Sequence, residues 1–299
     1  MKLIRSEIIK RAHGGSESCR LFHGRGHSFP GYEDLLIDWF HPVVLITLYR
    51  SRDDAWLKQL ATVLFSSLCR VECIILQQRY LPNSPSRILF GELPEEVDAV
   101  EDGLKYRLRL NSAQNIGFFL DMAQGRRLIA RGVKGKKILN LFSYSCSFSV
   151  AAIASGATQV VNVDMNRGAL QLGRFNHQLN HLDLRKTSFL PLEVFRSFSK
   201  LRKLAPFDLI ICDPPDTQGQ NFQPQRDWPK LVQKLPRLLS PGGELLFCLS
   251  SPNLSSHALQ QLVSQSGHNT QLLKVYHSDD CFPEKNLDNG LNILHYRVD

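Results

Sequence analysis

Three groups of residues in the second half of the chain each follow an apolar, strand-like run. They are the turn of residues 142–147, the acid Asp164, and the triplet Asp213, Pro214 and Pro215. In a nucleotide-binding sheet the loop after the first strand passes close to the ligand, and an acid at the tip of the second strand binds the two ribose hydroxyls. Because parallel strands end at the same edge of a sheet, we predict that the three groups meet there and bind a ligand that carries a ribose.

The elements that must position these groups have the order of a doubly wound α/β sheet. A strand over residues 137–140, a helix that stops at Gly156 and a second strand over residues 160–164 form one strand–helix–strand unit. Such crossovers are right-handed in nearly all proteins, which places the helix on one face of the sheet. A helix over residues 168–180 follows, and its expected apolar stripe consists of Leu170, Leu172, Phe175 and Leu179.

The alternation of strands and helices continues to the end of the chain. Further strands are predicted over residues 188–190, 207–212 and 244–249, helices over residues 194–201, 228–239 and 255–265, and a closing hairpin over residues 271–277 and 291–297. The predicted fold is therefore α/β, a doubly wound seven-stranded Rossmann-like sheet with a smaller N-terminal α+β domain.

Four short motifs resemble one family when they are taken together. They read Asn-Leu-Phe-Ser-Tyr at residues 140–144, Val-Asp-Met at 163–165, Asp-Pro-Pro at 213–215 and Gly-Phe-Phe-Leu-Asp at 117–121. In order and spacing they are similar to the S-adenosylmethionine-dependent methyltransferases that modify large-subunit ribosomal RNA, a family with cytosine-C5 and guanine-N7 enzymes. The likeness runs from about Gly91 to the end and is weaker over residues 20–31.

The resemblance implies S-adenosylmethionine as the cofactor and assigns it a set of contacts. The implied cofactor-binding residues are Phe142, Ser143, Tyr144, Ser145, Cys146, Asp164, Met165, Glu193 and Asp213. For Glu193, which would approach the adenine amine, a plain role as an acid at a helix start stays open. Asp213, Pro214 and Pro215 are the implied catalytic residues, because in the family this motif holds the target base beside the methyl group.

The same resemblance implies substrate contacts from residues that precede the first strand in the sequence and from one that follows it. The implied substrate-binding residues are Phe118, Phe119, Asp121, Arg126 and Phe222. For Phe118 and Phe119, packing as a core anchor is an equal alternative to base stacking. Phe222 is included because relatives have an aromatic residue two positions past the prolines, where this chain has Thr217.

Three departures from the family pattern bear on activity. Cys146 stands where relatives have Gly, and a side chain there resists a positive φ angle, so we expect weaker cofactor binding or a re-routed loop. Ala123 stands where relatives have Arg. Residues 1–19 are too few to build the RNA-binding barrel that relatives carry, so the chain is expected to be a shortened member of the family.

The position of one cysteine decides between two kinds of base methylation. Methylation at cytosine C5 requires a thiolate that first adds to C6, and cytosine-type relatives have this Cys after the fifth strand in a Phe-Ser-Cys-Ser context. Here Cys248 comes one position early and Leu249 takes the place of the thiolate. A shift of one residue turns a strand side chain to the opposite face, so we favour a ring or amino nitrogen of a base over cytosine C5.

Four regions are predicted along the chain. Residues 1–19 are a basic N-terminal segment, residues 20–95 a small α+β domain, residues 96–127 a β-hairpin with a connecting segment, and residues 128–299 the domain that binds S-adenosylmethionine. Residues 1–31 hold six Lys or Arg against two acids, which fits either a flexible segment that faces RNA or a solvated tail.

Charge and composition restrict the class of protein further. The chain has 36 Lys and Arg against 28 Asp and Glu, a formal net charge of +8 that suits a polyanionic partner such as RNA. No apolar stretch reaches the roughly 20 residues of a membrane span and no signal-peptide core is present, so no membrane partner and a cytoplasmic location are expected. The seven Cys lack paired metal spacing, so we expect reduced thiols and no metal site.

The expected function is therefore methylation of an RNA base, in ribosomal RNA processing, with S-adenosylmethionine as methyl donor. Two alternatives stay open: a catalytically weak or inactive RNA-binding or assembly protein of the same fold, and a methyltransferase for a small molecule or a protein. An NAD-dependent dehydrogenase is not supported, because residues 142–147 contain no Gly-x-Gly-x-x-Gly. The oligomeric state is not determined by the sequence, and a homodimer is one option.

Overall fold

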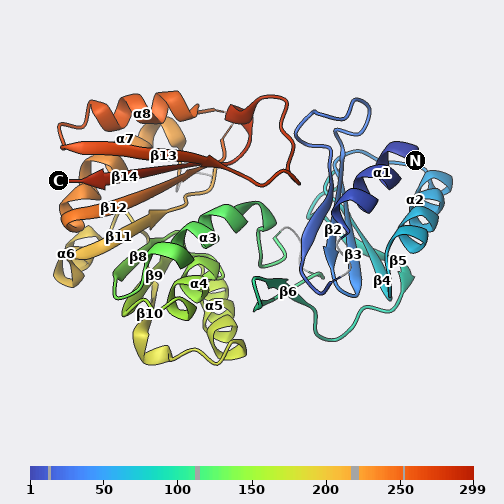
Figure 1. Ribbon diagram of the computed structural model, residues 1–299, viewed down its shortest axis with the longest axis horizontal. Helices are drawn as coiled ribbons and strands as arrows, with labels where there is room; N and C mark the ends of the chain where they lie inside the picture. The colour runs from blue at the N-terminus through green and yellow to red at the C-terminus, as the bar shows by residue number, and fades with distance from the viewer. Residues whose placement is uncertain (13–14, 112–114, 217–221, 252) are drawn as a thin grey trace. The chain divides into compact units, whose positions relative to one another are not determined.

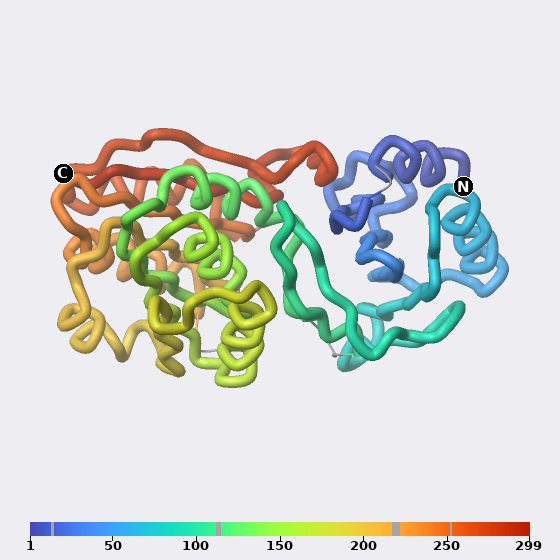
Figure 2. Tube along the Cα trace, turned by 60° about the horizontal axis from the view of Figure 1, so that its bottom comes forward, coloured from blue at the N-terminus to red at the C-terminus, as the bar shows by residue number. Residues whose placement is uncertain are grey.

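The computed structural model describes residues 1–12, 15–111, 115–216, 222–251 and 253–299. The chain forms two compact units, whose course is shown in Figures 1 and 2. Unit 1 consists of Met1–Asp121 with Asp279–Lys285, and unit 2 consists of Met122–Ser278 with Asn286–Asp299. Within the described ranges, no helix has both the length and the apolar character needed to cross a lipid bilayer.

Unit 1 is built on a five-stranded sheet in the strand order β1-β2-β3-β4-β5. Its strands are β1 (Cys19–His23), β2 (Leu35–Phe40), β3 (Val43–Leu48), β4 (Cys73–Gln78) and β5 (Ser86–Gly91). Strands β3 and β4 are parallel and helix α2 (Asp54–Ser67) connects them, whereas the other neighbours are antiparallel. The hairpin of β6 (Asp98–Glu101) and β7 (Leu104–Arg107) forms a separate two-stranded sheet.

The N-terminal segment differs from the flexible, RNA-facing stretch that its charge suggested. Lys2–Arg11 form helix α1, and Ile4 and Ile8 on this helix are fully buried in the core of unit 1. Arg11 is also buried, since its guanidinium donates a hydrogen bond to the Leu21 carbonyl. The physical reason is the spacing of the two isoleucines, which gives the helix an apolar stripe that is stabilised by burial.

The segment Asp279–Lys285 lies between two strands of unit 2 in the sequence but belongs to unit 1. The carboxylate of Glu284 lies 3.2 Å from Nε2 of His23. The ring of Phe282 lies 5.0 Å from the guanidinium carbon of Arg20. A late segment of the chain therefore supplies side chains that pack on the first strand of unit 1.

Unit 2 contains the predicted seven-stranded sheet, in the order β10-β9-β8-β11-β12-β14-β13. Its strands are β8 (Lys137–Leu141), β9 (Gln159–Asp164), β10 (Thr187–Pro191), β11 (Phe207–Cys212), β12 (Leu239–Leu249), β13 (Thr270–His277) and β14 (Asn292–Val298). The first five in the sheet order are parallel, and β14 is antiparallel to both of its neighbours. This arrangement confirms the predicted fold class and brings the carboxyl ends of β8, β9 and β11 together.

Helices cover both faces of this sheet (Figure 1). They are α3 (Ala123–Gly132), α4 (Ser147–Ala154), α5 (Arg167–Leu179), α6 (Phe198–Leu204), α7 (Pro224–Lys234) and α8 (Ser256–Ser264), with short 3-10 turns at η1 (Leu120–Met122), η2 (Leu184–Lys186), η3 (Pro236–Leu238) and η4 (Leu287–Asn289). One core cluster contains side chains of α6, α7 and α8, and a second contains side chains of α3 and α4. Successive strand residues alternate between them, so Phe247 joins the first cluster and Cys248 the second.

A partly exposed carboxylate on β12 contacts β14 and the residue before β8, far from the edge where Asp164 lies. Glu244 on β12 has Oε2 at 3.3 Å from Nζ of Lys136 and at 3.1 Å from Nε2 of His295, and its Oε1 lies 3.9 Å from Nη2 of Arg297. The hydrogen bond with His295, together with the positive charge of Lys136, lowers the pKa of Glu244 to about 2. The ionised carboxylate therefore stabilises the folded sheet.

Replacing Glu244 with Gln should lower the free energy of unfolding at pH 7 by about 1 kcal/mol, because Gln keeps the shape but loses the charge. The pKa of Glu244 is lower in the folded protein than its ordinary value of 4.5. Its contribution is therefore complete above about pH 5 and is lost as the pH falls toward about 2. Urea unfolding of both proteins at pH 7 and at about pH 3.5 should show a difference that shrinks at the lower pH. An equal difference at both pH values would contradict this assignment.

Candidate active site

The loop that follows β8 has an unusual backbone for a segment without Gly. Phe142, Tyr144 and Cys146 have φ angles of 56°, 45° and 60°. The left-handed conformation costs about 1–3 kcal/mol at a residue other than Gly. The Ser143 N–H donates to the Val163 carbonyl at 3.1 Å, and the Cys146 N–H donates to the Ser143 carbonyl at 2.7 Å. Such strain persists only where surrounding contacts impose it, so the contacts of this loop are the starting point for the site.

Asp164 lies at the carboxyl end of β9, directly beside this loop. Its Oδ2 accepts the Tyr144 N–H at 2.8 Å, and its Oδ1 accepts the Asn166 N–H at 2.8 Å. Each carboxylate oxygen can accept a further hydrogen bond, so Asp164 can hold the loop and two ribose hydroxyls at the same time. Met165, the next residue, is 44% exposed, and its apolar side chain is accessible to a flat ring such as adenine.

Helix α5 holds the last part of the loop. The buried Asn176 donates a hydrogen bond from its amide to the Ser145 carbonyl at 3.1 Å. Gly173 lies against Cys146, since a Cβ atom on Gly173 would come 2.4 Å from the Cys146 Sγ. The fully buried Cys146 side chain therefore packs on α5 and points away from solvent. Burial raises the pKa of the Cys146 thiol well above its ordinary value, which keeps the thiol protonated at neutral pH.

A chain of buried polar side chains connects α4 and α5 to the sheet. Asn140 Nδ2 donates to Asn162 Oδ1 at 2.9 Å, and Asn162 Nδ2 donates to Ser149 Oγ at 3.0 Å. Ser149 Oγ lies 2.9 Å from Nε2 of His177, whose Nδ1 lies 2.7 Å from the Gly173 carbonyl. Burial lowers the pKa of His177 to about 4, so the imidazole is neutral at pH 7. The network fixes both helices without a buried charge.

The residues of α5 that support the loop were not among the predicted site residues. The predicted apolar stripe includes Phe175, which is 38% exposed, whereas Gly173, Asn176 and His177 face the interior. A Gly in the middle of a helix is unfavourable by about 1 kcal/mol relative to Ala. That Gly, followed three and four residues later by two polar residues, is the signal in the sequence that could have identified this face.

The triplet Asp213, Pro214 and Pro215 lies at the carboxyl end of β11, next to β8. The Asp213 N–H is 3.5 Å from the Leu141 carbonyl, which places the triplet beside the start of the loop. The hydroxyl of Ser251 donates a hydrogen bond to the Asp216 carboxylate, so the turn after the prolines is tied to the end of β12. The three groups predicted from the sequence therefore meet at one edge of the sheet.

Two predicted ligand residues have structural roles instead. Both carboxylate oxygens of Glu193 accept backbone N–H groups, from Phe195 at 2.9 Å and from Arg196 at 2.8 Å, which supports the alternative of an acid that caps its own turn. Arg126, predicted to contact substrate, is 2% exposed, and its Nη1 lies 3.4 Å from the hydroxyl of Ser147 at the start of α4. Arg126 thus supports the cofactor loop from within the protein.

Phe222 does not support the predicted stacking on a base. It is 1% exposed and belongs to the core cluster of unit 2. Its ring lies 5.7 Å from the ring of Phe142 and 6.4 Å from the ring of Trp228. The ring would have to leave this core to meet a base. Thr217, which takes the place of the family's aromatic residue, lies outside the described residues.

The other predicted substrate residues belong to unit 1. Phe118 is 4% exposed and stacks on Tyr106 with ring centroids 4.5 Å apart, which favours the core-anchor alternative. Phe119 is 44% exposed, and Asp121 is half-buried at the end of the first segment of the unit. A substrate role for Phe119 and Asp121 stays a prediction.

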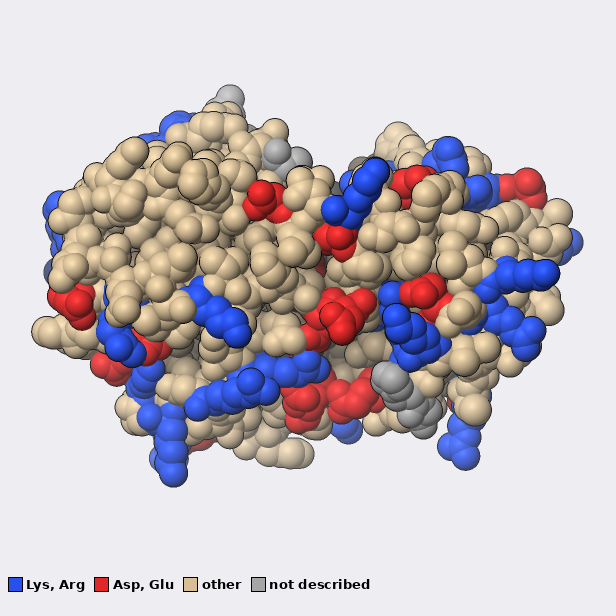
Figure 3. Space-filling model, turned by 45° about the horizontal axis from the view of Figure 1, so that its top comes forward, with Lys and Arg blue, Asp and Glu red and all other residues tan. Residues whose placement is uncertain are grey.

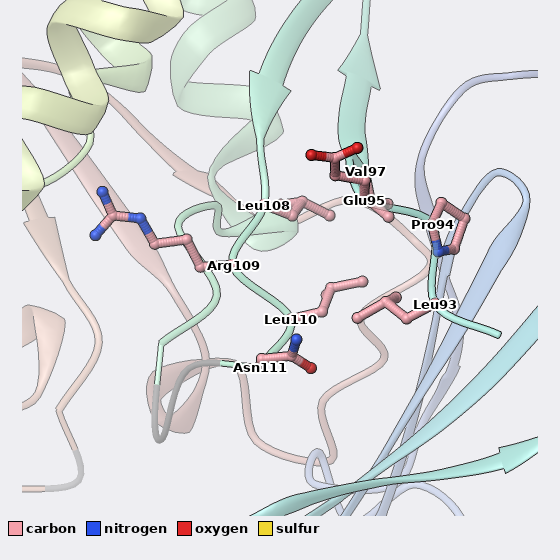
Figure 4. Close-up of a pocket in the computed structure, with 8 residues that line it drawn as sticks. All are labelled: Leu93, Pro94, Glu95, Val97, Leu108, Arg109, Leu110 and Asn111. Carbon is pink, nitrogen blue, oxygen red and sulfur yellow. The ribbon is translucent and has the colours of Figure 1, made fainter.

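Unit 1 also contains a cavity of about 450 Å³, shown in Figure 4. Its lining consists of Leu93, Pro94, Glu95, Val97, Leu108, Arg109, Leu110 and Asn111. In Figure 4 Leu93 and Leu110 face the same space, whereas the guanidinium of Arg109 extends away from it. The lining contains no nucleophile paired with a base, so we assign no catalytic chemistry to this cavity.

Neither a metal-ligand cluster among the described residues nor the overall charge helps to locate a binding site. In the part of the chain that the structure describes, no group of three His, Cys, Asp or Glu side chains is arranged to hold a metal ion. On the face drawn in Figure 3, Lys and Arg side chains are interspersed with Asp and Glu. The net charge of +8 therefore does not by itself identify a binding face.

The residues at this edge fit S-adenosylmethionine. The Asp164 carboxylate suits the two ribose hydroxyls, and the exposed Met165 suits one face of the adenine. The strained turn of residues 142–146 brings backbone groups to the ligand edge of the sheet. A seven-stranded sheet of this order, with these groups at three neighbouring strand ends, defines a class I methyltransferase that uses S-adenosylmethionine.

Comparisons with known proteins agree with this class. Residues 19–297 match the family model described as S-adenosylmethionine-dependent methyltransferase, and the chain therefore belongs to this family. S-adenosylmethionine is its cofactor. A methyltransferase solved in complex with S-adenosylhomocysteine matches 99% of this chain and 80% of its own chain, with a TM-score of 0.85 and 26% sequence identity.

The names of two curated relatives specify a substrate, which the family description does not. The chain is 32% identical over 198 residues to ribosomal RNA large subunit methyltransferase I of Aeromonas hydrophila, a match that covers 63% of this chain and 50% of that protein. It is 29% identical over 289 residues to the protein of the same name from Serratia proteamaculans, with coverage of 91% and 71%. The chain spans about half the length of the Aeromonas relative it matches.

Replacing Asp164 with Ala should weaken binding of S-adenosylhomocysteine by about 10- to 100-fold. The change removes both the acceptor for the ribose hydroxyls and the acceptor for the Tyr144 N–H, and each charge-assisted hydrogen bond contributes about 1.5–3 kcal/mol. Isothermal titration calorimetry measures the affinity. The matched control is Asp183→Ala, which removes a partly exposed carboxylate paired with Arg185. Equal affinity of the two variants would contradict the role of Asp164.

Replacing Gly173 with Ala should weaken S-adenosylhomocysteine binding by about 10-fold or more, because the new Cβ displaces Cys146 and with it the loop. The double variant Gly173→Ala with Cys146→Gly should regain most of the affinity, since it removes the two atoms that the Cβ would meet at 2.4 and 2.8 Å and leaves only the Ser145 backbone carbon at 3.2 Å. Calorimetry and thermal unfolding test both variants. Gly168→Ala is the control on the same helix, where a Cβ meets only the Asn166 side chain at 3.4 Å. Failure of the second substitution to rescue would show that the contact does not position the loop.

Proposed function

We propose that this methyltransferase modifies a base of RNA, with ribosomal RNA as the substrate class. The Aeromonas and Serratia relatives are named as ribosomal RNA large subunit methyltransferases, which supports an RNA substrate. The formal charge of +8 favours association with a polyanion. Both observations indicate a substrate class, and the site supplies the argument for a base as the acceptor.

The observation that carries the proposal is the position of Asp213, Pro214 and Pro215 beside the cofactor loop. Bound S-adenosylmethionine supplies an activated methyl group, so the protein has mainly to orient the acceptor, which can contribute roughly 7–11 kcal/mol. The Asp213 carboxylate and the adjoining carbonyl are hydrogen-bond acceptors, and they suit an amino group or ring N–H of a base. The hydrogen bond between Ser251 and Asp216 fixes the turn that presents them.

The cysteines favour a nitrogen atom of the base over cytosine C5. Methylation at C5 requires a thiolate nucleophile at the ligand edge. All three cysteines of unit 2, Cys146, Cys212 and Cys248, are buried. Cys248 joins the core cluster of α3 and α4, and burial raises the pKa of Cys212 well above its ordinary value. A nitrogen acceptor needs no covalent intermediate and is therefore consistent with these thiols.

The alternative of an inactive RNA-binding protein rests on three departures from the family pattern, of which Cys146 is the one in the cofactor loop. A side chain that filled the cofactor site would have favoured this alternative. Instead the buried Cys146 packs on Gly173, and its φ angle of 60° lies in the left-handed region that Gly adopts most readily. The geometry therefore favours an active enzyme.

The purified protein should transfer tritium from methyl-labelled S-adenosylmethionine to ribosomal RNA, and digestion to nucleosides should yield a base methylated on nitrogen. Replacing Asp213 with Ala should lower the rate by about 100-fold or more, because the acceptor is no longer oriented. S-adenosylhomocysteine affinity should change much less, and calorimetry measures it on the same sample. Label in 5-methylcytosine would contradict the nitrogen proposal. Label only in protein or small molecules would contradict an RNA substrate.

A further inference from the structure

One surface of unit 2 carries charge of a single sign. It is formed by α6, α7 and the short segments that flank them, and we call it the α6–α7 basic face. Its exposed basic residues are Arg196, Lys200, Arg202, Lys203, Arg226, Lys230, Lys234 and Arg237. Among the described residues of 192–240, no Asp or Glu is exposed. This differs from a usual protein surface, where both signs alternate.

The acids in this region do not neutralise the face. Asp227 is 1% exposed, and it accepts from Arg226 at 2.6 Å and from Lys230 at 2.8 Å, so that two cations share one carboxylate. Glu193 is engaged with backbone N–H groups. The other six basic residues form no ion pair within the ranges that the structure describes. The face therefore keeps a net positive charge.

Two lysines of α7 connect the two helices into one continuous surface. Nζ of Lys230 lies 5.6 Å from the ring centre of Phe195, and Nζ of Lys234 lies 4.8 Å from the ring centre of Phe198. These contacts place the exposed side of α7 beside the segment that enters α6. They also hold the ammonium groups in place over apolar rings, which reduces the conformational entropy lost when an anion binds.

The kind of partner follows from what the face lacks. None of the exposed large hydrophobic side chains of the described chain lies between residues 192 and 238. A protein interface has an apolar core, and a membrane-surface helix inserts an apolar face. A nucleic-acid backbone needs neither of these, because Lys and Arg contact its phosphates directly. The α6–α7 basic face therefore fits RNA better than a protein or a lipid surface.

The face also begins at the reaction edge of the sheet. α7 follows the carboxyl end of β11, where Asp213 lies, and residues 192–197 follow the carboxyl end of β10. Both helices then run toward the opposite edge of the sheet. α7 has 11 residues and is roughly 16 Å long. An RNA strand that presents a base at Asp213 can continue along this face.

We infer that the α6–α7 basic face binds the phosphate backbone of the substrate RNA and directs the strand to the base site. The inference rests on the proposed RNA substrate and adds where the RNA is held. It needs no contribution from an additional RNA-binding domain. The contacts are with phosphates, so they provide affinity and position rather than sequence preference.

The test compares two triple variants of the full chain. Lys200→Gln, Lys203→Gln and Lys234→Gln together change the face, and Lys58→Gln, Lys134→Gln and Lys274→Gln together are the matched control. Both sets remove three exposed lysines, and each includes one lysine that lies over an aromatic ring, Lys234 over Phe198 and Lys274 over Tyr276. The probe is a fluorescein-labelled polyuridine RNA of about 20 nucleotides, and anisotropy is measured over a range of salt concentrations.

The face variant should bind this RNA at least about 10-fold more weakly than the wild type. Its plot of log affinity against log salt should be flatter by about 2, since each phosphate contact with single-stranded RNA contributes roughly 0.7 to the slope. The control variant should resemble the wild type in both respects. All three proteins should bind S-adenosylhomocysteine equally by calorimetry, which shows that the fold and the cofactor site are intact.

The other outcomes separate this inference from the proposed function. RNA binding that is equal in the face and control variants would overturn the inference and leave an RNA substrate supported. A wild-type protein that binds S-adenosylhomocysteine but not RNA would overturn both. Loss of binding to phosphatidylserine vesicles in the face variant, with RNA binding unchanged, would also overturn the inference. The face would then recognise a lipid surface.

Discussion

The site depends on one constraint, a tight turn in which three residues other than Gly adopt left-handed backbone conformations. Phe142, Tyr144 and Cys146 together store roughly several kcal/mol of strain. The Asp164 carboxylate holds the middle of the turn by accepting the Tyr144 N–H, and α5 holds its end through Gly173 and Asn176. The ligand edge of the sheet is therefore preorganised by contacts that lie outside the loop.

This constraint explains why the surroundings of the loop are polar although they are buried. Asn162, Ser149 and His177 connect β9, α4 and α5 by hydrogen bonds of about 3 Å. A purely apolar interface would allow the two helices to slide, whereas hydrogen bonds between buried polar side chains specify their relative position. Because His177 is neutral at pH 7, this specification does not require a buried charge. The same residues thus determine both the packing of the helices and the shape of the cofactor loop.

The charge distribution gives the enzyme a second organising feature. The net charge of +8 is compatible with many partners, and both signs mix on the face drawn in Figure 3. On α6 and α7 the exposed acids are absent from the described residues, and two lysines lie over phenylalanine rings. Cofactor and RNA would then approach the same edge of the sheet by different chemistry. The cofactor meets a strained loop and one carboxylate, and in our proposal the RNA meets a surface of cations.

The sequence by itself determined the order of strands and helices in unit 2, the class I fold and the three groups at the strand ends, because apolar runs and their terminal residues are local properties of the chain. It did not determine which individual side chains are buried or what they contact. The positive charge of residues 1–31 suggested a flexible segment, but Ile4 and Ile8 pack into unit 1. Only the tertiary structure placed Phe222 and Arg126 in the interior and Cys146 against Gly173. These outcomes depend on contacts between residues distant in sequence, which no local pattern specifies.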